Sequence, residues 1–543
     1  MEKTDVVEHV EKSSINSPER NHFGDVKLVV DGEVVLVPTP SPDPKDPLNL
    51  PTWRKWVLLL IVSAFGCSSV VLASGLGAIF TNVVQSYPGE EARAQDLMIY
   101  PALFMGVGNF ISMPFTPVIG RRPIFLISAA VLMASSIGCA YSTSLSTHIA
   151  ARNIMALAAG QSEALCPTIV EEIHFLHERA RKLSWFIAIQ TTFVGVFFCT
   201  STFQVAAWGW RWWYGFFAIW NGLVFLFVIV FGTEPLYKRP DEAATGEVHL
   251  SVDAQGEYHT DEEGSTIVRV TTKHGVVLDP VRYGPRTWKY DLKPWSKLGE
   301  WRDVVTFLKD VVVGCCHPLL FWLLLLNGAF LGIYVFQATT FAPILIPPPY
   351  HIPFTSLGYI QGAQVFVCLI ALPILGYGSD ALVKWMSRRN NGLFKPEYRL
   401  PTLAIPAIAG VASAIIFGYA AASPAQWHWS AIAVPFNGVY FAFLGANIVG
   451  LTYAADSFPL KTASNFVVIC AGRGFIAFGL SYAVIPSVQS LGYDGTMNIE
   501  AGMAAGLSAL GIGAYFCGPA LRRLGERYFG LGASRGHPST SGV

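Results

Sequence analysis

Three charged residues stand out because each lies inside a long apolar run: Arg152, Glu163 and Arg473. Arg152 and Glu163 differ by only ~20° around a helix that turns about 100° per residue, so they share one face. A charge in mid-membrane costs about 2.5–3.5 kcal/mol on insertion scales, and such residues often serve ion or proton movement. We expect Glu163 to be a proton or cation site with Arg152 as its electrostatic partner, and Arg473 to bind an anionic group or a carboxylate of another helix. In the alternative, each charge lies near an interface or pairs permanently with a neighbour.

Two loops combine a glycine with several arginines at equivalent places in the chain. The first contains Gly120, Arg121 and Arg122, and the second follows Gly376 with Asp380, Lys384, Arg388 and Arg389. A carboxylate facing cationic residues can form a latch between helices that holds in one conformation and breaks in another. The arginines could instead be topology signals alone, but recurrence in two halves is typical of transporters.

The composition indicates that lipid surrounds these residues. Hydrophobic residues make up 52% of the 543, charged residues 14%, and the mean hydropathy is +0.43. Average proteins are about 25% charged, and so apolar a surface would aggregate in water. Runs of about twenty apolar residues predict twelve membrane-spanning helices in an all-α polytopic protein. They lie near 56–80, 97–119, 123–141, 148–173, 183–207, 211–233, 318–343, 357–378, 401–422, 429–454, 463–486 and 499–518.

The spacing of these runs divides the chain. We expect a polar cytoplasmic tail (1–52), a six-helix bundle (53–233), a cytoplasmic loop (234–317) with an amphipathic helix near 299–313, a second six-helix bundle (318–518) and a short cytoplasmic tail (519–543). Lys and Arg concentrate in the loops that this layout places inside, as the positive-inside rule requires. We therefore expect both termini in the cytoplasm and the protein in the plasma membrane, with the vacuolar membrane as the alternative.

Other function classes lack their sequence features. The 37 basic and 37 acidic residues balance, which argues against nucleic acid as a partner. No phosphate-binding Gly-rich loop indicates ATP hydrolysis, and no catalytic constellation indicates an enzyme. We expect no metal and no cofactor, a monomer, and nine cysteines that act as small core-filling residues. The expected partners are a small-molecule substrate, the lipid bilayer and protons.

Several stretches, in order along the chain, resemble the major facilitator superfamily, in particular its fungal branch related to proton-coupled multidrug antiporters. They are Asp46-Pro-Leu-Asn-Leu-Pro-Thr-Trp-Arg-Lys-Trp56, Glu163-Ala-Leu-Cys-Pro167, Leu176-His-Glu-Arg179, Gly209-Trp-Arg-Trp212, Arg389-Asn-Asn-Gly392, Pro396-Glu-Tyr-Arg-Leu-Pro401 and Tyr453-Ala-Ala-Asp-Ser-Phe-Pro459. The resemblance covers nearly the whole chain from about Pro44. It implies two six-helix bundles around a central cavity that opens to alternate sides of the membrane.

The resemblance also implies roles for individual residues. Cytoplasmic gating motifs would contain Gly120, Arg121, Arg122, Gly376, Asp380, Arg388, Arg389, Glu397 and Arg399. The substrate cavity would be lined by Gln190, Asn327, Tyr334, Gln337, Asn437, Tyr440 and Asn447, with Gln361 or Gln364 as further contributors. Each of these polar groups could instead make a hydrogen bond between helices.

The sequence departs from the superfamily's pattern in three places. Pro117 and Met113 replace the acid and the small glycine of the first loop motif. Phe197-Phe198 and Ser201-Thr202 replace the glycines and proline of the antiporter motif, and Met155-Ala156 replace Gln-Gly after Arg152. The expected function is secondary active transport of a small organic molecule, with proton-coupled export of a xenobiotic or secondary metabolite as the first hypothesis. Uptake or facilitated diffusion of a small polar nutrient is an alternative, as is a non-transporting membrane sensor.

Overall fold

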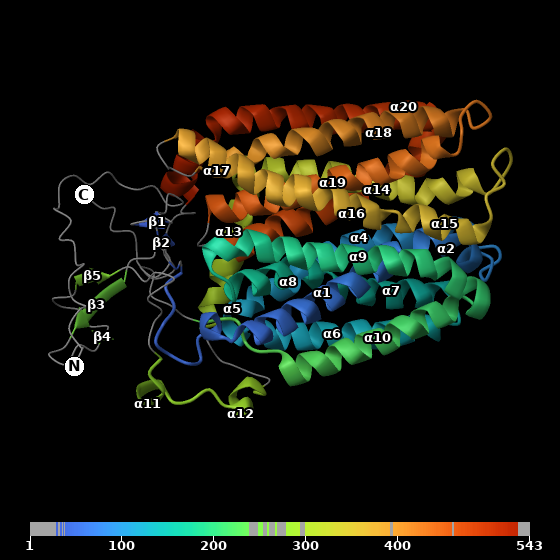
Figure 1. The fold of residues 1–543 in the computed structure, drawn as a ribbon. Coiled ribbons are helices and arrows are strands. Elements are labelled where there is room, and N and C mark those ends of the chain that lie inside the picture. The colour runs from blue at the N-terminus through green and yellow to red at the C-terminus, as the bar shows by residue number, and fades with distance from the viewer. Residues whose placement is uncertain are drawn as a thin grey trace.

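The computed structural model describes residues 29–30, 33–34, 36, 38–237, 248–252, 258–259, 266–268, 278–293, 299–390, 395–458 and 461–529. The predicted N-terminal and C-terminal tails therefore lie largely outside the described residues, as do parts of the central loop and Gly392. Short strands occur in the described parts of the tail and loop: β1 (Val29–Val30) pairs antiparallel with β2 (Glu33–Val34), and β3 (Val248–Val252) lies between β4 (Tyr258–His259) and β5 (Thr266–Val268). These strands lie beyond one end of a long helical bundle (Figure 1).

The first half of the bundle consists of helices from the N-terminal part of the chain. A short 3₁₀ turn, η1 (Pro47–Asn49), precedes these helices, which are given next in chain order. They are α1 (Thr52–Ser74), α2 (Leu76–Val84), α3 (Glu91–Ala94), α4 (Asp96–Ser112), the 3₁₀ turn η2 (Met113–Phe115), α5 (Thr116–Ile119), α6 (Arg121–Ala140), α7 (Leu145–Ala159), α8 (Gln161–Glu172), α9 (Leu176–Trp208) and α10 (Trp210–Phe231).

The second half follows a connecting segment that contains α11 (Pro280–Tyr283), α12 (Trp288–Asp291) and α13 (Arg302–Cys316). It consists of α14 (Pro318–Leu345), α15 (Phe354–Gly362), α16 (Gln364–Ala371), the π-helical η4 (Leu372–Gly378), α17 (Ser379–Arg389), the 3₁₀ segment η5 (Pro396–Leu403), α18 (Ala404–Ala422), α19 (Ser430–Ser457) and α20 (Thr462–Phe529). In Figure 1 these yellow to red helices lie over the blue to green first half.

The predicted twelve-helix membrane bundle is confirmed. Within the described residues, eleven helices are long and apolar enough to cross a membrane. The twelfth span is α7 with α8, because Gly160 between them keeps helical angles (φ −52°, ψ −33°) and continues the helix. Conversely, α20 contains two spans, which Gly492 separates with a φ of 74° that side-chain-bearing residues rarely adopt.

Several helices are longer than the apolar runs that predicted them. Span eight was expected to end at residue 378 but continues through α17 to Arg389, and span five begins at Leu176 rather than near residue 183. Backbone hydrogen bonding carries a helix past the point where its side chains become polar. Arg388 and Arg389 in the last turn of α17 complement the helix dipole at this end.

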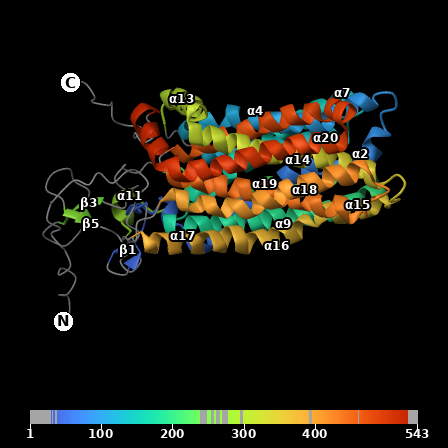
Figure 2. The same ribbon diagram turned by 90° about the horizontal axis from the view of Figure 1, so that it is seen from above.

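Different elements lie at the two ends of the bundle. Both views place α13, α17, α11 and the short strands at one end, and α2 and α15 at the opposite end (Figures 1 and 2). The halves contact each other along α4 with α20 and along α9 with α15 and α16. The amphipathic helix expected near 299–313 is confirmed as α13.

The core-filling prediction for the cysteines is only partly right. Cys67, Cys139, Cys166, Cys368 and Cys470 are buried, and Cys199 is half-buried. Cys315, Cys316 and Cys517 are exposed, which corrects the prediction for these three. An apolar sequence context does not distinguish a side chain that faces the protein from one that faces outward.

Candidate functional site

A central cavity of about 180 Å³ lies between the two halves. The first half contributes residues of α1, α4, α8 and α9, and the second contributes residues of α14, α16, α19 and α20. Drug-sized ligand sites commonly measure about 300–1,000 Å³, so this volume suits a small solute. The lining is mostly apolar, with a few convergent polar groups.

Glu163 and Arg473 form an ion pair across this cavity. Glu163 lies on α8 and Arg473 on α20, and the carboxylate Oε1 is 2.6 Å from the guanidinium Nη2. Both residues line the cavity. Arg473 Nη1 also donates to Oδ1 of Asn447 at 2.8 Å, and the guanidinium lies 5.5 Å from the ring centre of Phe443. The pair therefore joins the first half of the bundle to the second.

The prediction that Arg152 is the partner of Glu163 is wrong. Arg152 is fully buried and donates to the backbone carbonyls of Leu97 (2.9 Å) and Ala73 (3.0 Å) and to the hydroxyl of Tyr214 (2.9 Å). Sharing a helical face places two residues on one side of a helix, but their partners on other helices decide what each one contacts. Arg152 ties α7 to α1, α4 and α10 within the first half.

Four of the predicted cavity residues line the cavity: Gln190, Tyr334, Tyr440 and Asn447. The ring centres of Tyr334 and Tyr440 are 5.4 Å apart, and Gln364, which also lines the cavity, donates to the Tyr334 hydroxyl at 2.9 Å. These groups offer an aromatic surface with a few hydrogen-bonding positions.

Three others lie away from the cavity lining. Asn327 donates to the carbonyls of Leu323 (3.0 Å) and Ala446 (3.2 Å), and so joins α14 to α19. Asn437 likewise donates to Ile360 (3.1 Å) and Ala433 (2.9 Å). Gln337 is fully buried in α14. For Asn327 and Asn437 the structure therefore shows the alternative role, a hydrogen bond between two helices.

The amide of Gln361 donates to the carbonyl of Ser74 at 3.5 Å, which links α15 to α1. This long contact joins the two halves.

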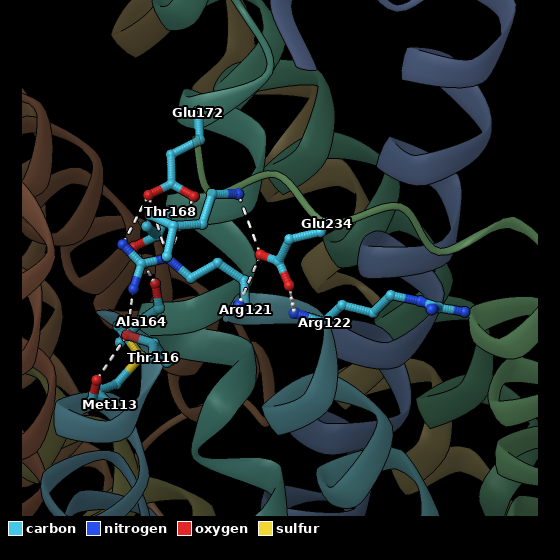
Figure 3. Close-up of polar contacts among 9 residues, drawn as sticks. Met113, Thr116, Arg121, Arg122, Ala164, Thr168, Glu172 and Glu234 are labelled. Atoms are coloured by element: carbon cyan, nitrogen blue, oxygen red, sulfur yellow. Dashed lines mark hydrogen bonds and ion pairs between the residues drawn. The ribbon is translucent and has the colours of Figure 1, made fainter. Parts of the chain in front are cut away.

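A charged cluster surrounds the first glycine–arginine loop. Arg121 Nη2 lies 2.7 Å from Oε1 of Glu172, at the end of α8. The carboxylate of Glu234 accepts the backbone N–H groups of Arg121 (2.8 Å) and Arg122 (3.1 Å), as Figure 3 shows. Gly120 has a φ of 103°, and a Cβ there would lie 2.3 Å from the Glu234 carboxylate. The loop thus requires a glycine at position 120 for both backbone conformation and space.

The acid that Pro117 replaces in this loop is therefore supplied from elsewhere in the fold. Burial raises the pKa of Glu234, while the backbone hydrogen bonds from Arg121, Arg122 and Leu236 oppose the rise. Arg122 donates in addition to the carbonyls of Ile229 (2.9 Å) and Lys293.

The second-half loop forms a related cluster with a different arginine than expected. Arg399 contacts Asp380 at 3.3 Å and Asp456 at 2.5 Å. The arginines that follow Asp380 in the sequence, Arg388 and Arg389, are exposed, and Arg389 lies 4.0 Å from the ring centre of Trp385. The expectation that these two face Asp380 is corrected, because they lie on the outer face of α17.

Glu397 and Arg522 form a second, buried pair at 2.8 Å, which ties η5 to α20. Gly376 lies in η4, one turn before Asp380. Sequence reasoning assigned no role to Glu172, Glu234, Asp456 or Arg522. A usable signal existed only for Asp456, since it lies inside the stretch Tyr453–Pro459 that carries the family resemblance.

The family model described as Major Facilitator Superfamily matches residues 57–469. The chain belongs to this superfamily. An uncharacterised transporter of the superfamily from Schizosaccharomyces pombe is 25% identical over 502 residues, which cover 86% of this chain and 84% of that protein. The efflux pump radE of Floropilus chiversii is 21% identical and is matched over 83% of its length by 88% of this chain.

A solved structure shares the fold. The proton:xylose symporter XylE, bound to 6-bromo-6-deoxy-D-glucose, aligns with a TM-score of 0.53 at 12% sequence identity, covering 84% of this chain and 94% of that one. At this identity the similarity establishes the major facilitator fold alone. The chain is thus a transporter of this superfamily, with a multi-pass arrangement in the membrane.

Proposed function

We propose that this transporter exports a small, amphipathic organic molecule, such as a xenobiotic or secondary metabolite, in exchange for protons. The observation that carries this proposal is the cavity between the halves, with the Glu163–Arg473 ion pair across it. The similarity to an efflux pump supports outward transport.

The chemistry of the cavity suits a substrate with little net charge. Glu163 and Arg473 neutralise each other, and the remaining lining combines Tyr334, Tyr440 and Phe443 with a few amides. Aromatic faces bind flat apolar groups through offset or edge-on contacts, and amides such as Gln190 accept and donate hydrogen bonds. A flat molecule with one or two polar groups fits this combination.

The ion pair supplies a means of coupling. Removing the charge of one partner of a buried ion pair costs about 3–5 kcal/mol of stability, because the other charge is left uncompensated. A proton on Glu163 removes its negative charge and hence its attraction for Arg473, so the halves separate more easily at this point. Alternating access then depends on whether Glu163 carries a proton.

We propose that the charged clusters at one end of the bundle support the gating motifs on the cytoplasmic side. Arg121 with Glu172 and Arg399 with Asp380 and Asp456 each lie within one half. They would hold each half rigid while the halves move relative to each other.

The proposed orientation and layout are those expected from the sequence. We propose cytoplasmic termini, a monomer in the plasma membrane, and a division into bundles at 53–233 and 318–518. In Figure 1, α5, which leads into Arg121 and Arg122, lies at the same end of the bundle as α17, whose last turn contains Arg388 and Arg389, and this supports the orientation by the positive-inside rule.

Flux in proteoliposomes tests the proposal. Purified protein would be exposed to a panel of neutral and monocationic aromatic dyes, with and without a pH gradient, against protein-free liposomes. For one proton exchanged per molecule, a gradient of one pH unit provides about 1.4 kcal/mol, or roughly a tenfold concentration ratio. We expect at least one dye to move against its gradient only when the pH gradient is present.

Two other outcomes would favour the alternative functions. Flux that ignores the pH gradient would contradict proton coupling and favour facilitated diffusion. Binding of dyes without any flux across the whole panel would favour a sensor.

A further inference from the structure

The helix α13 (Arg302–Cys316) is docked on both halves of the bundle. Its Asp310 forms an ion pair with Lys461 at 2.8 Å, and both side chains are almost fully buried. Trp301, the residue before the helix, contacts the ring of Phe115 in the first half at 6.4 Å between centres. Gly314 packs on Val468 of α20. Side-chain contacts with the bundle, and not only the chain on either side of it, therefore hold α13 in place.

The outward face of α13 is apolar. Trp301, Val305 and Val312 are 63%, 67% and 58% exposed. Their spacing of four and seven residues places all three on one side of the helix. Arg302 and Lys309 flank this face, and both are exposed. An apolar face bordered by long basic side chains is the pattern of a helix that lies in the membrane interface, where the charged groups reach the headgroups.

Two thiols lie at the end of this face. Cys315 and Cys316 are exposed, and only His317 separates them from Pro318, the first residue of the membrane-spanning α14. This places them at the level where a membrane-spanning helix leaves the bilayer. Among the described residues, the other exposed cysteine is Cys517, which lies within the last span of α20.

We propose that Cys316, and to a smaller extent Cys315, is a site of S-acylation by a long-chain fatty acyl group, which anchors the outward face of α13 in the cytoplasmic leaflet. Exposed cysteines on an amphipathic helix beside a membrane span are the positions at which such reversible modification occurs. The proposal goes beyond transport itself and rests on the proposed orientation, which places α13 on the cytoplasmic side.

The reaction is a thioester exchange with a long-chain acyl-coenzyme A. The cysteine Sγ attacks the carbonyl carbon of the donor and forms a new carbon–sulfur bond. The bond between that carbon and the coenzyme A sulfur breaks, and the coenzyme A thiolate takes up the proton that the cysteine thiol loses. Nothing is oxidised or reduced. Cys316 follows Val312 by four residues and so lies on the same outward face of α13, which is why we expect Cys316 to be the main acceptor. Partial desolvation also raises the pKa of the Cys315 thiol.

Contact with the lipid bilayer explains why the apolar side chains and the thiols on the outward face of α13 are both exposed from the protein. Val305 and Val312 would contact acyl chains of the bilayer, and the acyl group on Cys316 would extend in the same direction. A single acyl chain adds only marginal membrane affinity to a soluble protein, but here the helix is already bound to both halves. The modification would then fix how α13 lies on the bilayer.

Acyl–polyethylene glycol exchange on the full-length protein in yeast membranes tests the site. Free thiols are blocked, thioesters are cleaved with hydroxylamine, and the released thiols are tagged with maleimide–polyethylene glycol, so each acylated cysteine adds one mass step. We expect hydroxylamine-dependent tagging of the wild type, at least a twofold loss in Cys316→Ser, and complete loss in the Cys315→Ser, Cys316→Ser double variant. The matched control Cys517→Ser should match the wild type.

A second pair of variants tests the role of lipid while leaving both thiols in place. Val312→Asp puts a charge on the outward face and should lower tagging several-fold, whereas Thr306→Asp, on another side of the helix, should not. Absence of hydroxylamine-dependent tagging in the wild type, or tagging that persists in the double cysteine variant, would overturn the proposal. Equal tagging of Val312→Asp and Thr306→Asp would overturn the lipid-facing placement of α13.

Discussion

At the scale of single residues, the central feature is a carboxylate and a guanidinium on opposite halves of the bundle. The sequence singled out Glu163 and Arg473, because a charge within an apolar run is costly wherever it lies. It could not pair them, since helical periodicity relates residues of one helix and these two lie on α8 and α20. The same limit explains the incorrect partner proposed for Arg152, whose hydrogen bonds go to backbone carbonyls and a tyrosine.

The first prediction concerns the stability that this pair confers. Glu163→Leu leaves the buried Arg473 charge uncompensated and should lower the unfolding free energy by about 3–5 kcal/mol, whereas Arg473→Leu leaves the partly buried Glu163 and should lower it by less. The double variant removes both charges and should be more stable than either single variant. Unfolding of the four proteins in mixed detergent micelles measures the coupling. Strictly additive losses would mean that the two side chains do not interact energetically.

At the scale of the helices, α4 of the first half and α20 of the second approach each other closely at glycines. Gly106 of α4 faces the backbone of Ala471, and Gly474 of α20 faces that of Ala102. Small residues allow helix backbones in a membrane to approach closely. Gly474 is also the neighbour of Arg473, so the close approach and the ion pair lie at the same level.

The second prediction compares two glycines of α20. A Cβ at position 474 would lie 2.6 Å from the carbonyl oxygen of Ala102, whereas one at position 479 meets nothing within 4 Å. Gly474→Ala should force α4 and α20 apart, lower stability by about 1–3 kcal/mol and reduce dye flux at least tenfold. Gly479→Ala should keep wild-type flux and gain up to ~1 kcal/mol from helix propensity. Equal flux in both variants would show that close contact between α4 and α20 is not needed.

The bounds of the helices show which parts of the fold hydropathy predicts and which it does not. Apolar runs located every span, because lipid contact needs apolar side chains over a fixed length. They missed α17 and the start of α9, which are helical but polar. The amphipathic helix was found from its pattern, whereas the outward orientation of Cys315 and Cys316 depended on which face docks against α20 and α14.

At the scale of the whole molecule, two halves of six spans meet around one cavity. The sequence predicted this layout from the spacing of its apolar runs and from loops that recur in both halves. It did not predict how the first half replaces its missing acid, because Glu234 and Glu172 reach Arg121 through the folded chain. The charged clusters act within each half, while Glu163 and Arg473 connect the halves. Proton binding at this connection is the step on which the proposed mechanism depends.

The most direct test is dye flux driven by a pH gradient in proteoliposomes containing Glu163→Gln. The glutamine keeps the size of the side chain but cannot lose or gain the proton. Glu178→Gln is the matched control, since Glu178 lies at the start of α9 in an exposed pair with Arg181 at 3.5 Å. We predict that the control responds to the gradient like the wild type, and that flux in Glu163→Gln is the same with and without it. An undiminished response of Glu163→Gln to the pH gradient would contradict the account.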